Sequence, residues 1–514
     1  MKYIYFFFFS AFFFGGVHAQ IINFSDNNFK NKLLESGEDN LIAKNLEGIY
    51  FSIDSNANNQ IEISEALLVS ELNINSSSVI SLSGISFFSN LEILNCQNNS
   101  IATLNVSSLI NLKLIDCSYN QINSLNLNNL VNLENLLCNN NNITSLGLAT
   151  LVNLVHLNCN YNQIQNLELN NLEYIETLFC NNNTLSNLNL GFLTSLSKID
   201  CSYNQLTSLN LNSLVGLLEL NCNFNQLTTL NFINLYNIKI ISCKNNLLNT
   251  LNVSNYTTLE NLNCSNNNLT SLITQGAAQL ESLNCSSNQL INTNFNQLVN
   301  LEILDFSNNL FTTFNVSNLS TLSSLNCNQN QLTSLDLGSS SSSIQTIYCS
   351  YNLLTNLDLR NVSQLTGLFC SNNLLTSILI KNGSIQEYLV ISGNPSLNYI
   401  CADASEIEFV NEMLAYNNIT NCTVDSSCSL SDDIETTTAD IILYPNPAED
   451  KLFLNGLNLD TTKSFHIFNS IGQEVKTIFK PSELVIDLNN LQSGIYIIKI
   501  DTEKSFFSSK FVKK

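Results

Sequence analysis

The chain has 514 residues, of which 44% are hydrophobic and only 12% are charged. This apolar content is enough for a folded core, and the length predicts about three domains. Residues 441–514 hold nine Lys and eight acidic residues. Residues 1–440 hold the other ten basic and 33 acidic residues, so their net charge is -23. Arg360 is the only arginine and the chain has three His, which excludes a basic nucleic-acid surface and disfavours imidazole-based metal or acid–base chemistry.

The first 19 residues predict an export signal. Met1-Lys2 is followed by an apolar run from Tyr3 to Phe14, which is too short to span a bilayer. Val17 and Ala19 place small residues at the -3 and -1 positions of a cleavage site, so we expect cleavage between Ala19 and Gln20. No cysteine follows that point directly, so a lipid anchor is not indicated.

A 21-residue repeat occupies the middle of the chain. Its clearest mark is a series of cysteines, and Phe306 and Ile391 stand in two further slots of the same series. One extra residue is accommodated between 339 and 343. The cysteines are Cys96, Cys117, Cys138, Cys159, Cys180, Cys201, Cys222, Cys243, Cys264, Cys285, Cys327, Cys349 and Cys370.

The sequence around each slot reads L-x-x-L-x-C-x-x-N-x-L, followed by a shorter L-x-L, as at Leu112–Ile122 and Leu125–Leu127. This pattern resembles the leucine-rich repeat, whose period and signature it matches over residues 91–394, or 15 units. Alternation around motif position 4 predicts a short strand with one buried face. We therefore expect an α/β-type leucine-rich-repeat solenoid dominated by a parallel β-sheet, roughly 70 Å long at about 4.8 Å per strand.

Two motif positions have structural interpretations. The ninth is Asn in every unit, and a buried amide can satisfy the peptide groups of the turn that follows the strand. The cysteine slot predicts an inward-facing column of buried, reduced thiols that act as apolar fillers. Disulfides between neighbouring units and a zinc site are weaker alternatives, because parallel side chains in one straight column suit neither geometry.

Residues 20–90 are expected to form an N-terminal cap, with a short helix from Phe29 to Leu34 and a strand from Ile49 to Ile53. Within the cap, residues 54–65 resemble an EF-hand or dockerin-type calcium loop, although Asn59 stands where glycine is usual. A turn held by side-chain hydrogen bonds is the alternative. The possible structural calcium would be held by Asp54, Asn56, Asn58, Gln60, Glu62 and Glu65.

Residues 395–430 predict a C-terminal cap with a helix from Glu406 to Tyr416. In an oxidising compartment, Cys401 is expected to form a disulfide with Cys428, and Cys422 is the rival partner. Residues 431–440 have no apolar periodicity and are interpreted as a linker.

Residues 441–514 predict a small antiparallel β-sandwich of short strands, at Ile441–Leu443, Lys451–Leu454, Phe465–Phe468, Leu484–Leu488 and Ile495–Ile500. Landmarks along it resemble the type A C-terminal sorting domain of the type IX secretion system of Bacteroidota. The resemblance implies passage through the periplasm and the outer membrane, removal of the domain within 431–440 or before Tyr444, and surface attachment or release. The landmark residues are Tyr444, Pro445, Asn446, Pro447, Gly472, Gly494 and Tyr496.

Aromatic residues on the outward face of the repeat sheet are the candidate ligand-binding residues. Tyr348, Tyr351 and Phe369 form the densest group, and Tyr and Phe offer large contact area with few rotors. Asn and Asp at motif position 5 add adaptable hydrogen bonds. A tyrosine that simply fits a half-exposed strand end is the alternative. Further candidates at motif position 8 are Tyr119, Tyr161 and Tyr203.

The sequence thus predicts a secreted or cell-surface binding protein, not an enzyme, whose partner is an extracellular protein or polysaccharide. A surface glycan-active enzyme that uses the stacked Glu260, Glu281 and Glu302 is one alternative. A passive adhesin or spacer is the other. No cofactor other than the possible calcium is expected.

Overall fold

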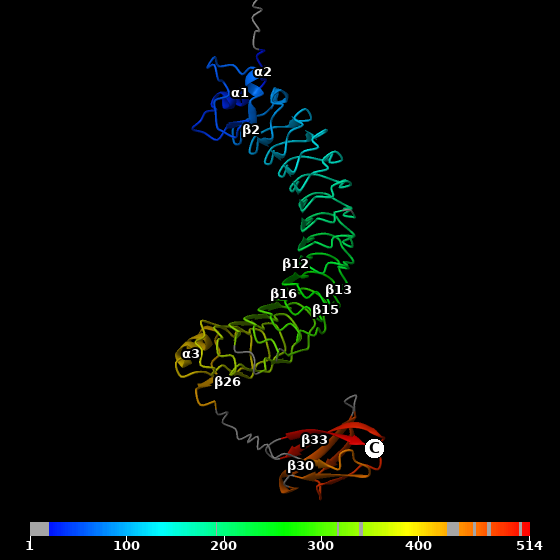
Figure 1. Cartoon of the computed structure of the whole chain (residues 1–514). Helices are drawn as coiled ribbons and strands as arrows, with labels where there is room; N and C mark the ends of the chain where they lie inside the picture. The colour runs from blue at the N-terminus through cyan, green and yellow to red at the C-terminus, as the bar shows by residue number, and fades with distance from the viewer. Residues whose placement is uncertain are drawn as a thin grey trace, which may run out of the picture. The chain divides into compact units, whose positions relative to one another are not determined.

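The computed structural model describes residues 20–191, 193–315, 318–338, 343–428, 442–455, 459–469, 474–502 and 506–514. The expected signal peptide with Ala19, the linker 431–440 and Gly472 lie outside these residues. The chain divides into two compact units, Met1–Ser426 and Ser427–Lys514. The first is a solenoid and the second is a small β-unit (Figure 1).

The solenoid is built on one long sheet, in which each strand lies parallel to the strand 21 or 22 residues away. From β3 to β25, 15 described strands follow one another, one for each repeat unit. In order these are β3 (Ile93–Asn95), β5 (Leu114–Asp116), β7 (Asn135–Leu137), β8 (His156–Asn158), β9 (Thr177–Phe179), β10 (Lys198–Asp200), β11 (Glu219–Asn221), β12 (Ile240–Ser242), β14 (Asn261–Asn263), β16 (Ser282–Asn284), β17 (Ile303–Asp305), β19 (Ser324–Asn326), β21 (Thr346–Tyr348), β23 (Gly367–Phe369) and β25 (Tyr388–Val390).

Each strand is three residues long, and the central residue at motif position 4 is buried, as Ile115 is in β5. The cysteine that follows each strand is fully buried, and Phe306 and Ile391 are buried in the same column. One unit cannot cover its own apolar side, so stacking supplies a single core that runs through the whole solenoid. The parallel solenoid expected from the repeat is confirmed.

The shorter L-x-L segments form a second, interrupted set of parallel strands. In Figure 1, β12 and β16 lie on the inner side of the curved solenoid, whereas β13 and β15 lie on its outer side. The second set comprises β4 (Thr103–Asn105) with β6 (Ser124–Asn126), β13 (Thr250–Asn252) with β15 (Ser271–Ile273), β18 (Thr313–Asn315) with β20 (Ser334–Asp336), and β22 (Asn356–Asp358), β24 (Ser377–Leu379), β26 (Tyr399–Cys401) and β27 (Thr423–Asp425).

The Asn at motif position 9 ties successive turns together. Asn141 donates from Nδ2 to the carbonyls of Cys117, Cys138 and Asn139 at 3.0, 3.1 and 3.3 Å. Its Oδ1 accepts the Ile122 N–H at 2.9 Å. The same set recurs along the column, so one buried amide hydrogen-bonds four backbone groups around the turn that follows each strand.

The N-terminal cap closes the first end of the core. Helix α1 (Asn27–Leu34) begins at Asp26, whose carboxylate accepts N–H groups of the helix and of Ile80 and Ser81. Strand β1 (Ala43–Asn45) pairs antiparallel with β2 (Val69–Asn73), and β2 pairs in parallel with β3 of the main sheet. Helix α2 (Ile63–Ala66) and the 3-10 turn η1 (Ile85–Phe87) complete the cap.

The strand expected from Ile49 to Ile53 is wrong. In that segment only Tyr50 forms an isolated bridge, to Lys44, because the chain there turns back across the end of β1.

The C-terminal cap covers the other end of the core. Helix α3 (Ile407–Tyr416) buries Val410 and Leu414. Cys401 and Cys428 are both disulfide-bonded, whereas Cys422 carries a free thiol.

The second unit contains two antiparallel sheets. One holds β28 (Ile442–Tyr444), β29 (Lys451–Asn455) and β32 (Val485–Asp487), and the other holds β31 (Glu474–Phe479), β30 (Thr462–Asn469), β33 (Gly494–Thr502) and β34 (Phe506–Lys513), with the turn η3 (Leu459–Thr461) before β30. Leu452 and Ile486 of the first sheet share a core with Phe465 and Ile498 of the second, as in a sandwich. The sequence analysis did not predict β31 and β34.

Candidate functional site

The cysteine column offers no nucleophile. All 13 thiols are buried and free of disulfides. Burial raises the pKa of Cys159, Cys243 and Cys370 to about 12, and it raises the pKa of the other column thiols as well. A thiol that stays protonated and out of contact with solvent is a packing group.

The polar residues at motif position 5 are largely committed to the fold. Asp116 accepts both the backbone N–H and the hydroxyl of Ser118, at 3.0 and 2.6 Å. Asp200 does the same with Ser202, and Asn158 accepts the Asn160 N–H. These bonds end each strand in a tight turn. Each of these bonds uses one oxygen of the side chain, so the role of these residues as ligand contacts stays a prediction.

Aromatic residues replace Asn or Asp at this position near the end of the main sheet. The rings of Tyr348 and Phe369 are stacked, with centroids 4.6 Å apart and planes at 17°. Tyr388 extends the stack beyond Phe369 at 6.4 Å and 19°, and it is 60% exposed. We call Tyr348, Phe369 and Tyr388 the aromatic stack. The sequence analysis missed Tyr388 because it stands at motif position 3, two residues before the position that supplies the other rings.

Tyr351 is exposed on the same unit as Tyr348, but its ring makes no contact with another ring among the described residues. The grouping of Tyr351 with Tyr348 and Phe369 therefore stays a prediction. Motif position 8, which Tyr351 occupies, has a left-handed backbone, with φ 58° at Tyr351.

The remaining position-8 aromatics share this backbone. Tyr119, Tyr161 and Tyr203 have φ of 54°, 51° and 52° and are about half exposed. Tyr203 stacks on Phe224 with centroids 4.2 Å apart, and the Lys244 ammonium lies 5.5 Å from the centre of the Phe224 ring.

The acidic residues considered for catalysis do not form an enclosed site. Glu281 and Glu302 are exposed, and Glu260 is ion-paired with Lys239 at 2.7 Å. His156 lies on β8 inside the main sheet, where its Nδ1 is 2.8 Å from the Thr177 hydroxyl.

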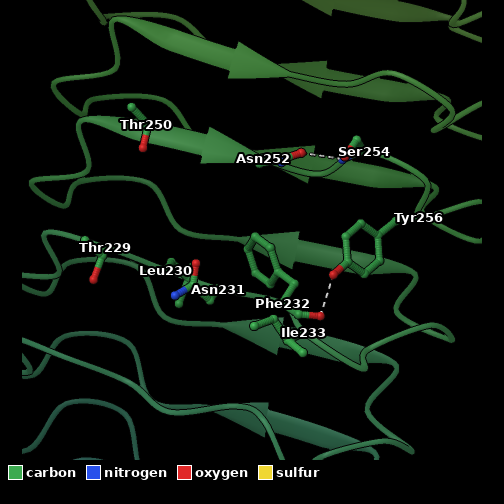
Figure 2. A pocket seen from close by; sticks show the side chains of 9 residues that line it. All are labelled: Thr229, Leu230, Asn231, Phe232, Ile233, Thr250, Asn252, Ser254 and Tyr256. Atoms are coloured by element: carbon green, nitrogen blue, oxygen red, sulfur yellow. Dashed lines mark hydrogen bonds between the residues drawn. The ribbon is translucent and has the colours of Figure 1, made fainter.

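Three shallow pockets open on the outer side of the solenoid, where the second set of strands is interrupted. Their volumes are about 330, 390 and 340 Å³. Figure 2 shows the first, between the segment 229–233 and β13, where the Tyr256 hydroxyl donates to the Phe232 carbonyl at 2.5 Å. Uncharged polar and apolar residues line this pocket, so it holds no acid–base pair.

The calcium-like loop is closed by its own side chains. Asp54 accepts the N–H groups of Asn58 and Asn59 at 3.1 and 2.9 Å. Glu62 accepts both side-chain amides of Asn56 and Asn58, at 3.2 and 2.7 Å. The Gln60 side-chain oxygen accepts a hydrogen bond from the Lys30 ammonium at 2.9 Å.

Two buried carboxyl groups meet beneath this loop. Glu65 accepts the N–H and the hydroxyl of Ser55, and it caps the N–H of Glu62. Burial and contact with Glu62 raise the pKa of Glu65, whereas the hydrogen bond from Glu65 lowers the pKa of Glu62. Across the described ranges, no group of three or more His, Cys, Asp or Glu is placed to hold a metal ion. The calcium site therefore stays a prediction.

The landmark residues of the second unit hold its two ends together. Asn446 accepts the Val512 N–H at 2.9 Å and donates to the Lys510 carbonyl at 3.2 Å. The Tyr496 hydroxyl donates to the Gln492 carbonyl at 2.8 Å, and its ring stacks on Phe511. Tyr444 stacks on Phe453 in the same way, and the bonds before Pro445 and Pro447 are cis. Gly494 opens β33.

The fold and these features define a leucine-rich-repeat solenoid followed by a small β-sandwich. Residues 442–514 match the family model of the secretion system C-terminal sorting domain. This domain directs export by the type IX secretion system to the cell surface or the extracellular space. Among the described residues, no helix has the length and apolar character needed to cross a membrane.

Solved structures share the solenoid fold. The functional domain of InlJ from Listeria monocytogenes, which includes a cysteine ladder, is 20% identical, covers 96% of this chain and 99% of its own, and gives a TM-score of 0.56. An internalin (inlF) from Listeria monocytogenes is 22% identical, over 70% of this chain and 93% of its own, with a TM-score of 0.49. YopM from Yersinia pestis is 25% identical, covers 65% of this chain and 89% of its own, and gives a TM-score of 0.48. No curated protein matches the chain.

Proposed function

We propose that this chain is a secreted or cell-surface binding protein that recognises an extracellular protein or glycan and catalyses no reaction. The observation that supports this function best is the aromatic stack, because it places three large rings side by side at the end of the main sheet. Such rings are the side chains that most often dominate binding energy.

The sheet beneath the stack favours binding because it is rigid. Tyr348, Phe369 and Tyr388 stand on β21, β23 and β25, which are joined by consecutive parallel ladders. Their positions are therefore fixed before a ligand arrives, and little conformational entropy is lost on binding. The exposed edge of the stack and the free face of Tyr388 would contact the ligand.

The enzyme alternative finds little support in the site. The column thiols are protonated and buried, Glu281 and Glu302 are exposed, and Glu260 is ion-paired with Lys239, so neither set has the enclosed, activated geometry that catalysis needs. If Glu281 were catalytic, Glu281→Gln would abolish glycan turnover; we expect no turnover in either the wild-type chain or this variant.

The test is an array of extracellular glycans and surface proteins probed with the full secreted chain. We expect a specific partner, and we expect the combined change Tyr348→Ala, Phe369→Ala and Tyr388→Ala to weaken its capture at least about tenfold. Tyr236→Ala is a matched control, because Tyr236 is 69% exposed and lies outside the main sheet. Unchanged capture by the triple variant would place the binding surface elsewhere, and no partner at all would favour the passive spacer.

A further inference from the structure

Position-8 aromatics do not occur at random along the solenoid. Tyr119, Tyr161 and Tyr203 stand in alternate units, and Asn140 and Asn182 take the same position in the units between them. Phe224 follows in the unit after Tyr203. We call Tyr119, Tyr161, Tyr203 and Phe224 the tyrosine row. The two-unit period is not needed by the 21-residue fold, which repeats every turn.

A second position follows the same alternation. Two residues after each ring of the tyrosine row comes an exposed glutamine, whereas Asn142 and Thr184 follow in the units between. Among the described residues, the side-chain amides of these glutamines have no hydrogen-bond partner. They are Gln121, Gln163, Gln205 and Gln226.

The rings occupy a backbone conformation that disfavours them. Every position-8 residue from Asn98 to Asn372 has φ between 50° and 58°, a region that Asn tolerates and that is uncommon for bulky residues. Asn is the commonest residue at this position, in seven of these 14 units, as the local geometry alone would favour. Aromatic residues in strained positions point to a function at that place, since the fold would be more stable without them.

The tyrosine row is held at a fixed spacing. The N–H of Tyr119 donates to the Asn139 carbonyl at 2.9 Å, and that of Tyr161 donates to Asn181 at 3.0 Å, so the strand ladder continues through the turns. Alternate turns of such a ladder lie about 10 Å apart. Within the described chain, the rings of Tyr119 and Tyr161 have no ring partner, so they are open to a ligand.

The chemistry of the row suits a neutral sugar polymer. Aromatic rings pack against the C–H faces of sugars, and primary amides hydrogen-bond their hydroxyl groups. In an extended β-1,4-linked polysaccharide each sugar is turned over relative to the one before, so the same face returns at every second sugar, at a spacing close to two turns of this solenoid. The net charge of -23 over residues 1–440 disfavours anionic polymers.

We propose that the tyrosine row binds a neutral, linear β-1,4-linked polysaccharide laid along the solenoid, one disaccharide for every two repeat units. This assignment rests on the proposed binding function and names its ligand class. It is independent of the aromatic stack, which stands on other units.

A proline-rich peptide is the rival, because a polyproline II helix repeats about every 9 Å. Such peptides dock into grooves whose aromatic residues are flanked by apolar walls. In the units between the rings of this row, Asn140 and Asn182 take the ring position, and Asn142 and Thr184 stand two residues further on. The polar surroundings therefore favour the polysaccharide.

The experiment is calorimetric titration of the full secreted chain with cello-, xylo- and manno-oligosaccharides of two to eight sugars. We expect one of the three series to bind, and its affinity to increase in steps of two sugars until the oligosaccharide spans the row. Polygalacturonate serves as the anionic comparison and is expected not to bind.

Replacement by Asn gives a clean variant, because Asn is the native residue at this position in Asn140 and Asn182. Tyr161→Asn keeps the left-handed turn and removes its strain, so we expect thermal stability to be unchanged or higher. Affinity for the longest oligosaccharide should fall at least about tenfold. Tyr174→Asn is the control, because Tyr174 is 60% exposed but lies outside the row, and it should bind like the wild-type chain.

Three outcomes would overturn the assignment. The first is binding of none of the three series, and the second is equal binding by Tyr161→Asn. The third is row-dependent binding of a polyproline peptide in place of the sugars. None of these would remove the proposed binding function if the triple variant of the aromatic stack still fails to capture a partner that the wild-type chain binds. If no ligand depends on either the tyrosine row or the aromatic stack, the proposed binding function is wrong as well.

Discussion

The Asn at motif position 9 is the single residue on which each turn depends. Asn183 is 8% exposed, and its Nδ2 donates to the carbonyls of Cys159, Cys180 and Asn181 while its Oδ1 accepts the Ile164 N–H. A hydrophobic substitute would leave the Ile164 N–H without a partner. Each of the three carbonyls would lose one of two hydrogen bonds, since Asn162, Asn204 and the Tyr161 N–H also donate to them. The residue type is therefore dictated by the turn, which explains its presence in every unit.

We expect Asn183→Ala to lower the free energy of unfolding by about 2–4 kcal/mol, because the buried Ile164 N–H loses its partner and three carbonyls each lose one hydrogen bond. Urea unfolding followed by far-UV circular dichroism would measure the loss. Asn187→Ala is the matched control: Asn187 is exposed in the same unit, and the change should cost less than about 0.5 kcal/mol. Equal losses in the two variants would contradict the role given to Asn183.

Glu406 gives the C-terminal cap a pH dependence. Its Oε1 accepts the Gln386 N–H at 2.6 Å, and within the described chain its Oε2 and the Gln386 Oε1 are buried without partners. Burial raises the pKa of Glu406, so the folded cap holds this proton at a pH where the unfolded chain has lost it. The resulting stability is present below about pH 4.3, the usual Glu pKa, and is lost as the pH rises through the folded pKa.

Glu406→Gln should remove this pH dependence and stabilise the cap at neutral pH, since an amide can stay neutral and donate. Thermal unfolding between pH 4 and 8 would show a flatter profile for this variant than for wild type. Glu408→Gln, on the exposed side of α3, should leave the wild-type profile unchanged. Identical profiles for the wild-type chain and Glu406→Gln would refute the assignment.

At the scale of elements, the loop between residues 54 and 65 has two competing uses for its carboxyl groups. Helix α2, which the sequence analysis did not predict, begins at Glu62 and buries Glu65 against the loop. Its capping box uses the same carboxyl groups that a calcium ion would need. Calcium binding and the hydrogen bonds of the loop are therefore alternatives for these two side chains.

If calcium binds, adding it should raise the unfolding temperature of the N-terminal cap, and the gain should fade at acidic pH. The reason is that the raised pKa of Glu65 keeps this group protonated there, and a protonated carboxyl is a poor ligand. Calorimetry of the full chain with millimolar calcium would measure both effects. Asp54→Asn is the comparison variant, and no heat from the wild-type chain would remove the hypothesis.

At the scale of the molecule, stacking hides a column of thiols from an oxidising environment. Thirteen column thiols are buried, and Cys422 is a half-buried free thiol whose pKa is raised by burial to about 11. Neighbouring units share one continuous core, so no column thiol becomes accessible unless turns separate.

We therefore expect native protein at pH 8 to react with iodoacetamide only slowly, and at Cys422 alone. In urea without reductant, 14 thiols should react. Mass spectrometry of the alkylated chain counts them, and Cys422→Ala should leave no reactive thiol in the native state. Fast native labelling of the column would show that the stack opens.

The sequence by itself determined the solenoid, its 15 units, the buried thiol column and the Asn ladder, because a repeat every 21 residues lets each unit pack only against its neighbours. It also predicted the export unit, because Asn446 and Tyr496 are sequence landmarks of that unit. In the structure they hydrogen-bond to backbone groups at its C-terminal end and at Gln492. What the sequence could not show was which polar residues the turns use: the Oδ1 atoms of Asp116 and Asn158 accept hydrogen bonds from Ser118 and from the Asn160 N–H.

Only the tertiary structure decided where the side chains of different turns meet. The rings of Tyr348 and Phe369 stack with Tyr388, whereas the Tyr351 ring joins no stack among the described residues. Likewise, the chain from Ile49 to Ile53 has the composition of a strand but forms only an isolated bridge, from Tyr50 to Lys44. Contacts between units depend on the backbone direction at each position, and residue type alone does not encode that direction.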